Sequence, residues 1–185
     1  MQTYMRNFRI IAAVLGLCLC ASAGAQDLQH QKFAQKIKGN RVKMSFAYQS
    51  HFNKMDFAGT GEILYLDGSF MLTLGEDSAI VNNRATSWTL DYQNKECVVE
   101  KGYAVDLGRS PRQIFELFGQ NTKGAEIVTA YRNDDTLSKI EARMKGGNFI
   151  KIIITKTEIL ESLDTGVFSV DTKLLGRDWV ITDLR

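Results

Sequence analysis

Short alternating segments constrain the fold of this chain more than any other feature of its sequence. From residue 41 onward, apolar side chains recur at every second position, as in Val42, Met44, Phe46 and Tyr48. A period of two places these side chains on one face of a β-strand. The same kind of segment returns along the rest of the chain, and the single proline, Pro111, interrupts none of them. The sequence therefore predicts a mainly β protein.

Turn signals divide this pattern into at least eight strands. Asp67-Gly68 is a strong hairpin signal, and Gly146-Gly147 marks a similar turn later in the chain. Residues 160–170 form an irregular return that contains Phe168. The short connections predict antiparallel pairing throughout. The expected strands are residues 41–49, 57–66, 70–74, 79–81, 86–92, 97–99, 126–131, 137–144, 149–157 and 179–184.

Two segments have helical signals instead. In Asp27–Asn40, Asp27 is a suitable N-cap, and Leu28, Phe33 and Ile37 lie near one face. In the second segment, Ser110 is a suitable N-cap and Pro111 fits the first helical position. An apolar stripe follows and Gly119 closes it; the stripe consists of Ile114, Leu117 and Phe118.

Several strands are apolar on both faces. Ile63 and Tyr65 oppose Leu64 and Leu66, and the segment from residue 149 to 155 shows the same property. A sheet with one face in water should alternate more strictly. Either helices cover the second face, or part of it forms an apolar surface for a ligand. With only two clear helices, the sequence predicts a sandwich or a strongly curved sheet with some apolar surface left uncovered.

The first 25 residues have the features of a cleavable signal peptide. Arg6 and Arg9 precede an apolar run, Ile10–Leu19, and Ala23-Gly24-Ala25 is a small-x-small cleavage pattern, which makes Gln26 the expected mature N-terminus. The run is too short for a permanent membrane anchor. Lipid attachment at Cys18 or Cys20 is disfavoured because a bulky leucine precedes each of them. We therefore expect a signal peptide over 1–25 and one domain over 26–185.

The mature chain offers few groups for chemistry. Without Arg6 and Arg9 it has 21 basic and 21 acidic residues, which gives no electrostatic reason to expect nucleic-acid binding. Its one thiol, Cys97, cannot form an internal disulfide and is typical of a small buried side chain. His30 and His51 have no partners at metal-ligand spacing.

No catalytic motif is present in the sequence. There is no G-x-S-x-G nucleophile elbow. Gly59-Thr60-Gly61 lies inside a strand and indicates a bend or close packing, and Asp134-Asp135 indicates a turn. We therefore expect a binding protein rather than an enzyme, with no metal and no cofactor.

The order of these segments resembles a known family. Phe168–Asp171, followed by Trp179–Arg185, resembles the ending of the bacterial periplasmic lipoprotein-carrier family (LolA-like proteins). Further upstream, the likeness covers most of the mature chain. The segments similar to its first two strands, its Trp-containing hairpin and its mid-chain helix are Val42–Phe46, Gly59–Tyr65, Asn82–Leu90 and Ser110–Phe118.

The resemblance implies an unclosed antiparallel β-barrel in which helices cover an apolar cavity. In this family the cavity receives the acyl chains of a lipoprotein from an inner-membrane donor complex and carries them across the periplasm to an outer-membrane acceptor. The chain would accordingly be a monomeric periplasmic carrier of acylated lipoproteins or other lipids. The alternatives are a lipid-sensing or regulatory module on the same fold, and an enzyme that acts on hydrophobic substrates.

On this basis we predict the residues of the cavity and its lid. The wall would draw on Phe46, Tyr48, Phe57, Ile63, Tyr65, Phe70, Leu72, Trp88 and Leu90, and the lid on Ile114, Leu117 and Phe118. One family feature has no counterpart. Many members carry a proline and then an arginine that bonds to the lid on the strand after the first hairpin, whereas Gly68–Leu74 contains neither.

Overall fold

The computed structural model describes residues 28–118, 120 and 122–185. The expected signal peptide, the mature N-terminus at Gln26, the cap at Asp27 and the helix end at Gly119 lie outside these residues. Within the described part of the chain, no helix has the length and apolarity needed to cross a bilayer.

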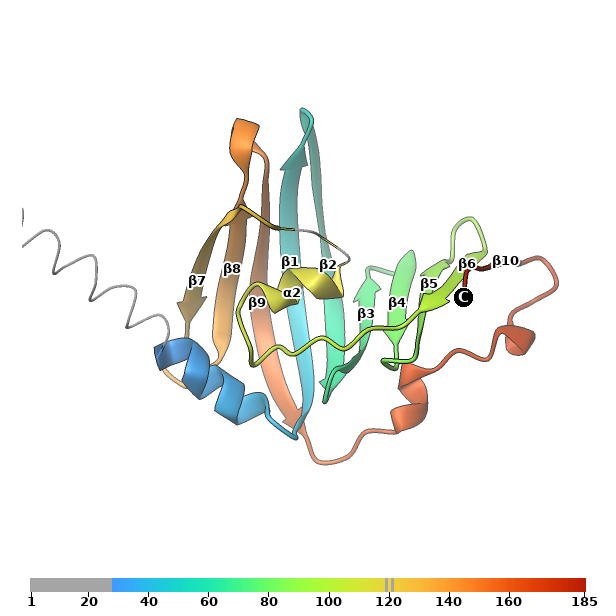
Figure 1. Ribbon diagram of the computed structural model, residues 1–185, viewed down its shortest axis with the longest axis horizontal. Helices are drawn as coiled ribbons and strands as arrows, with labels where there is room; N and C mark the ends of the chain where they lie inside the picture. Colours follow the sequence, from blue (N-terminus) through green and yellow to red (C-terminus); the bar gives the residue numbers. More distant parts are fainter. Residues whose placement is uncertain (1–27, 119, 121) are drawn as a thin grey trace, which may run out of the picture.

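Ten strands form one open, curved sheet in the order β10-β6-β5-β4-β3-β2-β1-β9-β8-β7 (Figure 1). In the described chain β7 and β10 are its two edges, so the prediction of a mainly β, unclosed sheet is confirmed. The strands are β1 (Arg41–Phe52), β2 (Met55–Leu66), β3 (Ser69–Leu74), β4 (Ser78–Asn82), β5 (Thr86–Asp91), β6 (Glu96–Lys101), β7 (Glu126–Tyr131), β8 (Leu137–Arg143), β9 (Phe149–Leu160) and β10 (Val180–Asp183).

The prediction of antiparallel pairing throughout is wrong for one strand. All neighbouring strands are antiparallel except β10, which is parallel to β6. The long return after β9 allows this, because parallel neighbours need a crossover rather than a tight turn. It contains the short 3₁₀ segments Thr165–Phe168 and Thr172–Leu174. Val180 N then donates to Lys95 O at 2.8 Å, which begins the ladder.

The main core lies on the face of the sheet that carries the helices. Strand register brings fully buried Met44, Ile63 and Leu72 side by side across β1, β2 and β3. The N-terminal helix, residues 28–37, adds Phe33 and Ile37. The helix ends at residue 37 rather than at the expected residue 40, and it leaves Leu28 exposed.

His30, rather than Leu28, completes the buried stripe of this helix. Its Nδ1 lies 2.9 Å from the Tyr131 hydroxyl of β7, so the helix is hydrogen-bonded to one edge of the sheet. The connection from β6 to the mid-chain helix then crosses the same face, where Val105 and Leu107 are fully buried (Figure 1).

The mid-chain helix α2 (Gln113–Leu117) begins later than Pro111 because the preceding residues form a turn. Ser110 Oγ accepts a hydrogen bond from Arg112 N at 3.1 Å, and Ser110 O accepts one from Gln113 N at 3.0 Å. Ser110 therefore stabilises the turn that leads into α2. The buried side of α2 consists of Ile114, Phe115 and Leu117.

A second apolar cluster lies on the opposite face of β4, β5 and β6. It consists of Ala79, Val81, Trp88, Leu90, Cys97 and Val99. Val170, Leu175 and Trp179 of the C-terminal return pack against it, and nearby Phe168 is also buried. The C-terminal return thus covers the rear face of β4, β5 and β6, and Met71 of β3 also packs against this cluster.

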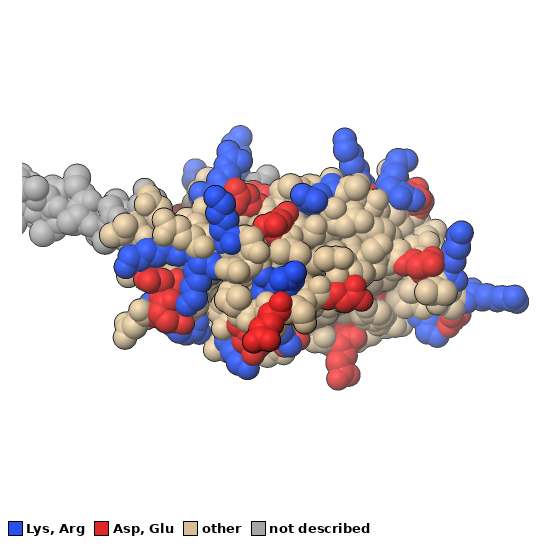
Figure 2. Space-filling view, turned by 90° about the horizontal axis from the view of Figure 1, so that it is seen from below, with Lys and Arg blue, Asp and Glu red and all other residues tan. Residues whose placement is uncertain are grey.

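Charged groups are mixed on the end of the molecule that lies away from the β1–β2 hairpin. Figure 2 views this end and shows basic and acidic side chains interspersed across it. No large area of one sign stands out in that view, in agreement with the balanced charge of residues 26–185.

Candidate functional site

An open apolar cleft lies on the helix-bearing face, where β1 and β2 approach their hairpin. Its volume is about 450 Å³. Strands β1, β2, β3 and β9 form its floor and sides, and the residues that follow α2 close one end. The lining residues are Tyr48, Ser50, Phe52, Phe57, Leu74, Phe118, Gln120, Ile150 and Ile152.

A bulge decides which residues of β9 face this cleft. The register between β1 and β9 shifts between Ser45 and Phe46, so Met44 pairs with Thr157 whereas Phe46 pairs with Ile154. The extra residue moves the even-numbered side chains of β9 onto the face of Phe46. As a result Ile150 and Ile152 line the cleft, and Ile153 is left 37% exposed on the other face.

Two glycines of β2 create room for the aromatic side chains of β1. A Cβ at Gly61 would lie 2.6 Å from Phe46 Cζ, and one at Gly59 would lie 2.8 Å from Tyr48 Cε1. The two rings therefore lie directly against the β2 backbone. This confirms the close-packing interpretation of Gly59-Thr60-Gly61.

Phe118 marks the boundary between the filled core and the open cleft. Its ring packs edge-on against Phe46 with 5.4 Å between centroids. On one side of it, Ile114 and Leu117 are buried beneath α2, so the space under the helix is occupied. The hollow expected beneath the 110–118 segment lies instead beyond the C-terminal end of α2.

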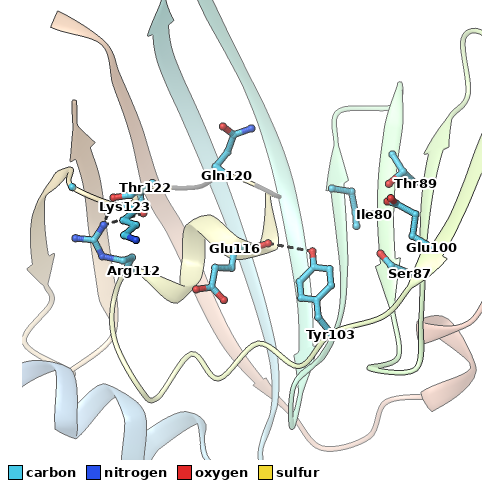
Figure 3. A pocket seen from close by; sticks show the side chains of 11 residues that line it. Ile80, Ser87, Thr89, Glu100, Tyr103, Arg112, Glu116, Gln120, Thr122 and Lys123 are labelled. Atoms are coloured by element: carbon cyan, nitrogen blue, oxygen red, sulfur yellow. Dashed lines mark hydrogen bonds between the residues drawn. The ribbon is translucent and has the colours of Figure 1, made fainter. Parts of the chain in front are cut away.

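A second, more polar pocket of about 650 Å³ adjoins α2 (Figure 3). One wall comes from the sheet and the other from α2 and its flanking loops. Gln120 lines both this pocket and the apolar cleft, so the two hollows are neighbours. The residues of the polar pocket are Ile80, Ser87, Thr89, Glu100, Tyr103, Arg112, Glu116, Gln120, Thr122, Lys123 and Gly124.

Hydrogen bonds tie α2 to its flanking loops. The Arg112 guanidinium donates to Thr122 O, and its Nη2 donates to Ala125 O at 3.0 Å. The Tyr103 hydroxyl donates to Glu116 O at 3.2 Å, as Figure 3 shows. Burial of the Tyr103 ring raises its pKa, so this hydroxyl stays protonated at neutral pH. Arg112 thus connects the start of α2 to the loop that follows the helix.

The predicted wall residues separate into three groups. Tyr48 and Phe57 line the cleft, and Phe46 lies beside it against Phe118. Ile63, Phe70 and Leu72 are fully buried in the main core, together with Tyr65, whose hydroxyl donates to Val105 O at 3.1 Å. Trp88 and Leu90 lie on the opposite face, in the second cluster. Of the predicted lid residues, only Phe118 reaches the cleft.

The structure adds lining residues that were not predicted. These are Ser50, Phe52, Leu74, Gln120, Ile150 and Ile152. The pairing of β1 with β9 would have identified the isoleucines, because Tyr48 lies opposite Ile152 and Ser50 opposite Ile150. That pairing joins segments about 100 residues apart in the sequence, and the alternation of one strand carries no information about it.

Groups suited to metal binding are absent from the described residues: no three His, Cys, Asp or Glu side chains are placed to hold an ion. His51 belongs instead to the β1–β2 hairpin, where its Nδ1 lies 2.7 Å from Asp56 Oδ1 and its ring stacks on Phe149.

Comparison with known proteins gives similarity of fold only. No family model matches the chain, and no curated protein matches it. An uncharacterized conserved protein from Thermus thermophilus is similar in structure, with a TM-score of 0.49 and 9% identity over 87% of this chain and 99% of that chain. A LolA superfamily protein from Nitrosomonas europaea has a TM-score of 0.43 and 8% identity over 78% of this chain and 97% of that chain.

Proposed function

We propose that this protein is a periplasmic carrier that binds acyl chains in the apolar cleft and shuttles lipoproteins toward the outer membrane. The observation that carries the proposal is the open cleft of about 450 Å³, whose lining is mainly aromatic and aliphatic. The export signal expected over residues 1–25 supports the location. The sequence resemblance supports acylated lipoproteins, received from an inner-membrane donor complex and passed to an outer-membrane acceptor, as the cargo.

The size of the cleft suits reversible binding. Each buried methylene contributes roughly 0.8 kcal/mol, so about eight of them contribute about 6 kcal/mol before the losses of association. Those losses amount to at least about 4 kcal/mol. At most about 2 kcal/mol then remains, so the tail alone binds weakly and is readily released, and contacts to the head group must supply the rest of the affinity.

The polar pocket beside the cleft fits the other end of an amphiphile. A tail between Phe57 and Ile152 would place its head group near Gln120, the residue that both hollows share. The carrier would thereby separate the apolar and polar parts of one ligand without performing chemistry on it.

Acyl binding is tested with two matched variants of the purified exported protein. Phe57 is 50% exposed in the cleft, and Leu174 is 83% exposed in the C-terminal return. Phe57→Glu should weaken binding of a fluorescent fatty acid at least about ten-fold, because a carboxylate would face the tail, whereas Leu174→Glu should leave it unchanged. Equal binding by Phe57→Glu and the wild type, with both folded, would remove the cleft as the site.

One structural feature favours a second candidate, a lipid-sensing regulatory module. Phe118 lies at the end of α2 and also lines the cleft, so a bound tail would press on the segment that Arg112 and Tyr103 hold. The material that co-purifies with the exported protein separates the two functions by mass spectrometry. An acylated protein is expected for a carrier, and a single non-acylated protein partner for a regulator.

A further inference from the structure

Two hairpin tips project together at the open end of the cleft. One joins β1 to β2 through Asn53 and Lys54, and the other joins β8 to β9 through the turn Lys145–Gly147. Asn53 N donates to Asn148 Oδ1 at 3.2 Å, which connects the tips. Figure 1 shows both of them extending past α2 in the same direction.

The apolar lining of the cleft continues onto this end without a break. Phe52 and Phe57 line the cleft, and Met55 lies beyond them at the turn. Phe57 is 50% exposed and Met55 is 57% exposed. Together with Phe52, these side chains extend the apolar surface of the cleft to the tip of the β1–β2 hairpin.

The same tips concentrate positive charge. Segments 51–57 and 143–151 contain four basic residues, Lys54, Arg143, Lys145 and Lys151, against the single acid Asp56. Among the described residues, Asp56 is paired with His51 and Arg143 with Glu141, and none of the three lysines forms an ion pair. The end of the molecule seen in Figure 2 has mixed charges instead.

We propose that these tips dock the mouth of the cleft onto an anionic lipid bilayer. Met55 and Phe57 would enter the head-group layer, and the lysines would face lipid phosphates, each strengthening binding roughly five-fold. An acyl chain would then pass between bilayer and cleft without crossing water. This inference rests on the proposed function, because docking serves a cleft that holds acyl chains.

Vesicle flotation of the purified full-length exported chain tests the docking surface. Vesicles of phosphatidylcholine containing phosphatidylglycerol should bind the wild type, and vesicles of phosphatidylcholine alone should bind it at least about ten-fold more weakly. Lys54→Glu/Lys145→Glu should reduce binding to the anionic vesicles by at least about ten-fold. The control Lys38→Glu/Lys173→Glu makes the same change of charge at exposed sites away from the tips and should bind as the wild type does.

A second pair of variants tests the apolar part of the surface. Met55→Ser should weaken binding to the anionic vesicles several-fold, and Leu174→Ser should not, although both remove an exposed apolar side chain. Equal binding to neutral and anionic vesicles, or unchanged binding by the double tip variant, would overturn the proposal. So would the absence of binding to both kinds of vesicle.

Binding of a soluble fluorescent fatty acid separates this inference from the proposed function. The tip variants change none of the residues that line the cleft, so they should bind the fatty acid as the wild type does. Loss of vesicle binding with intact fatty-acid binding supports docking as a separate step. Vesicle binding by a wild type that takes up no fatty acid would refute the carrier function and leave the membrane surface standing.

Discussion

Replacing each of the two β2 glycines by alanine should have different effects: Gly61→Ala should lower the stability of the fold, and Gly59→Ala should change the shape of the cleft. At Gly61 the new Cβ would lie 2.1 Å from Thr73 O and 2.6 Å from Phe46 Cζ. The carbonyl belongs to β3, which is paired with β2, so it cannot move without distorting the sheet. The Phe46 ring is buried and cannot move away either.

The expected loss at Gly61 follows from two opposing effects. Overpacking of this kind costs about 1–3 kcal/mol, and contact with backbone places Gly61→Ala at the upper end. Alanine also restricts the conformations of the unfolded chain, which stabilises the folded state by about 0.4–1 kcal/mol. The net destabilisation is about 2 kcal/mol, or roughly 4–8 °C in Tm for a domain of this size.

At Gly59 the neighbouring atoms can move. The three atoms nearest to the new Cβ would all belong to the Tyr48 side chain, with Cε1 at 2.8 Å and the hydroxyl oxygen at 2.9 Å. Tyr48 is half-buried and borders the open cleft, so its ring can turn into that space. Gly59→Ala should therefore change stability by less than about 1 kcal/mol and weaken fatty-acid binding.

Urea unfolding followed by circular dichroism measures both stabilities, and fatty-acid titration measures the cleft. The reasoning is refuted if Gly61→Ala unfolds at the wild-type urea concentration, or if Gly59→Ala is destabilised as much as Gly61→Ala. Wild-type affinity in a folded Gly59→Ala protein would show that the Tyr48 ring does not border the ligand.

Other features give predictions that separate measurements check. Cys97 is fully buried and burial raises the pKa of its thiol, so a thiol reagent should label it only at the rate of unfolding; fast labelling of the native protein would contradict this. The Thr136 hydroxyl and amide lower the pKa of Asp134 from 3.8 to about 2, so its stabilising contribution is present above pH 3.8 and is lost as the pH falls toward 2. Asp134→Asn should flatten the acid dependence of the unfolding free energy in that window, and an unchanged slope would argue against the effect. Tyr103→Phe removes the hydrogen bond to Glu116 O, which should cost about 0.5–1.5 kcal/mol and speed amide exchange in α2 but not in β1, whereas equal acceleration in both would indicate global destabilisation.

Alternation and turn residues were sufficient to predict most of the sheet. The Asp67-Gly68 turn joins β2 to β3 as expected, with Asp67 and Gly68 both at positive φ. Predicted strands and observed strands coincide within a few residues because a half-buried strand needs a period of two wherever it lies. Alternation and turn residues depend on neighbours in the sequence, and so do the strands and tight hairpins that they predict.

The direction of β10 was not predictable in this way. Its residues, Val180–Asp183, have a strand pattern, but nothing within that short segment specifies a parallel partner. The partner is chosen by the path of the return, and that path depends on how Val170, Leu175 and Trp179 pack against the second cluster. Tertiary packing therefore decided the topology.

The predicted cavity wall shows the same limit. Trp88 and Leu90 are apolar and alternate correctly, but alternation does not say which of two faces they occupy. Counting pairs through the hairpins gives the answer, because Leu72 lies opposite Ile80 and Ile80 opposite Thr89, which places Trp88 on the other face. The turn positions in consecutive hairpins therefore determine which face each side chain occupies, whereas the apolar alternation of a single strand does not.

The apolar cluster on the rear face of β4, β5 and β6 is separated from the cleft by the sheet itself. A change of side-chain volume at Cys97 or Val99 of β6 can reach the cleft only through the strands. Sequence variation in this rear layer is therefore compatible with an unchanged cleft on the front face. For protein engineering, that rear layer is the place for a spectroscopic label or a stabilising substitution that leaves the cleft unchanged.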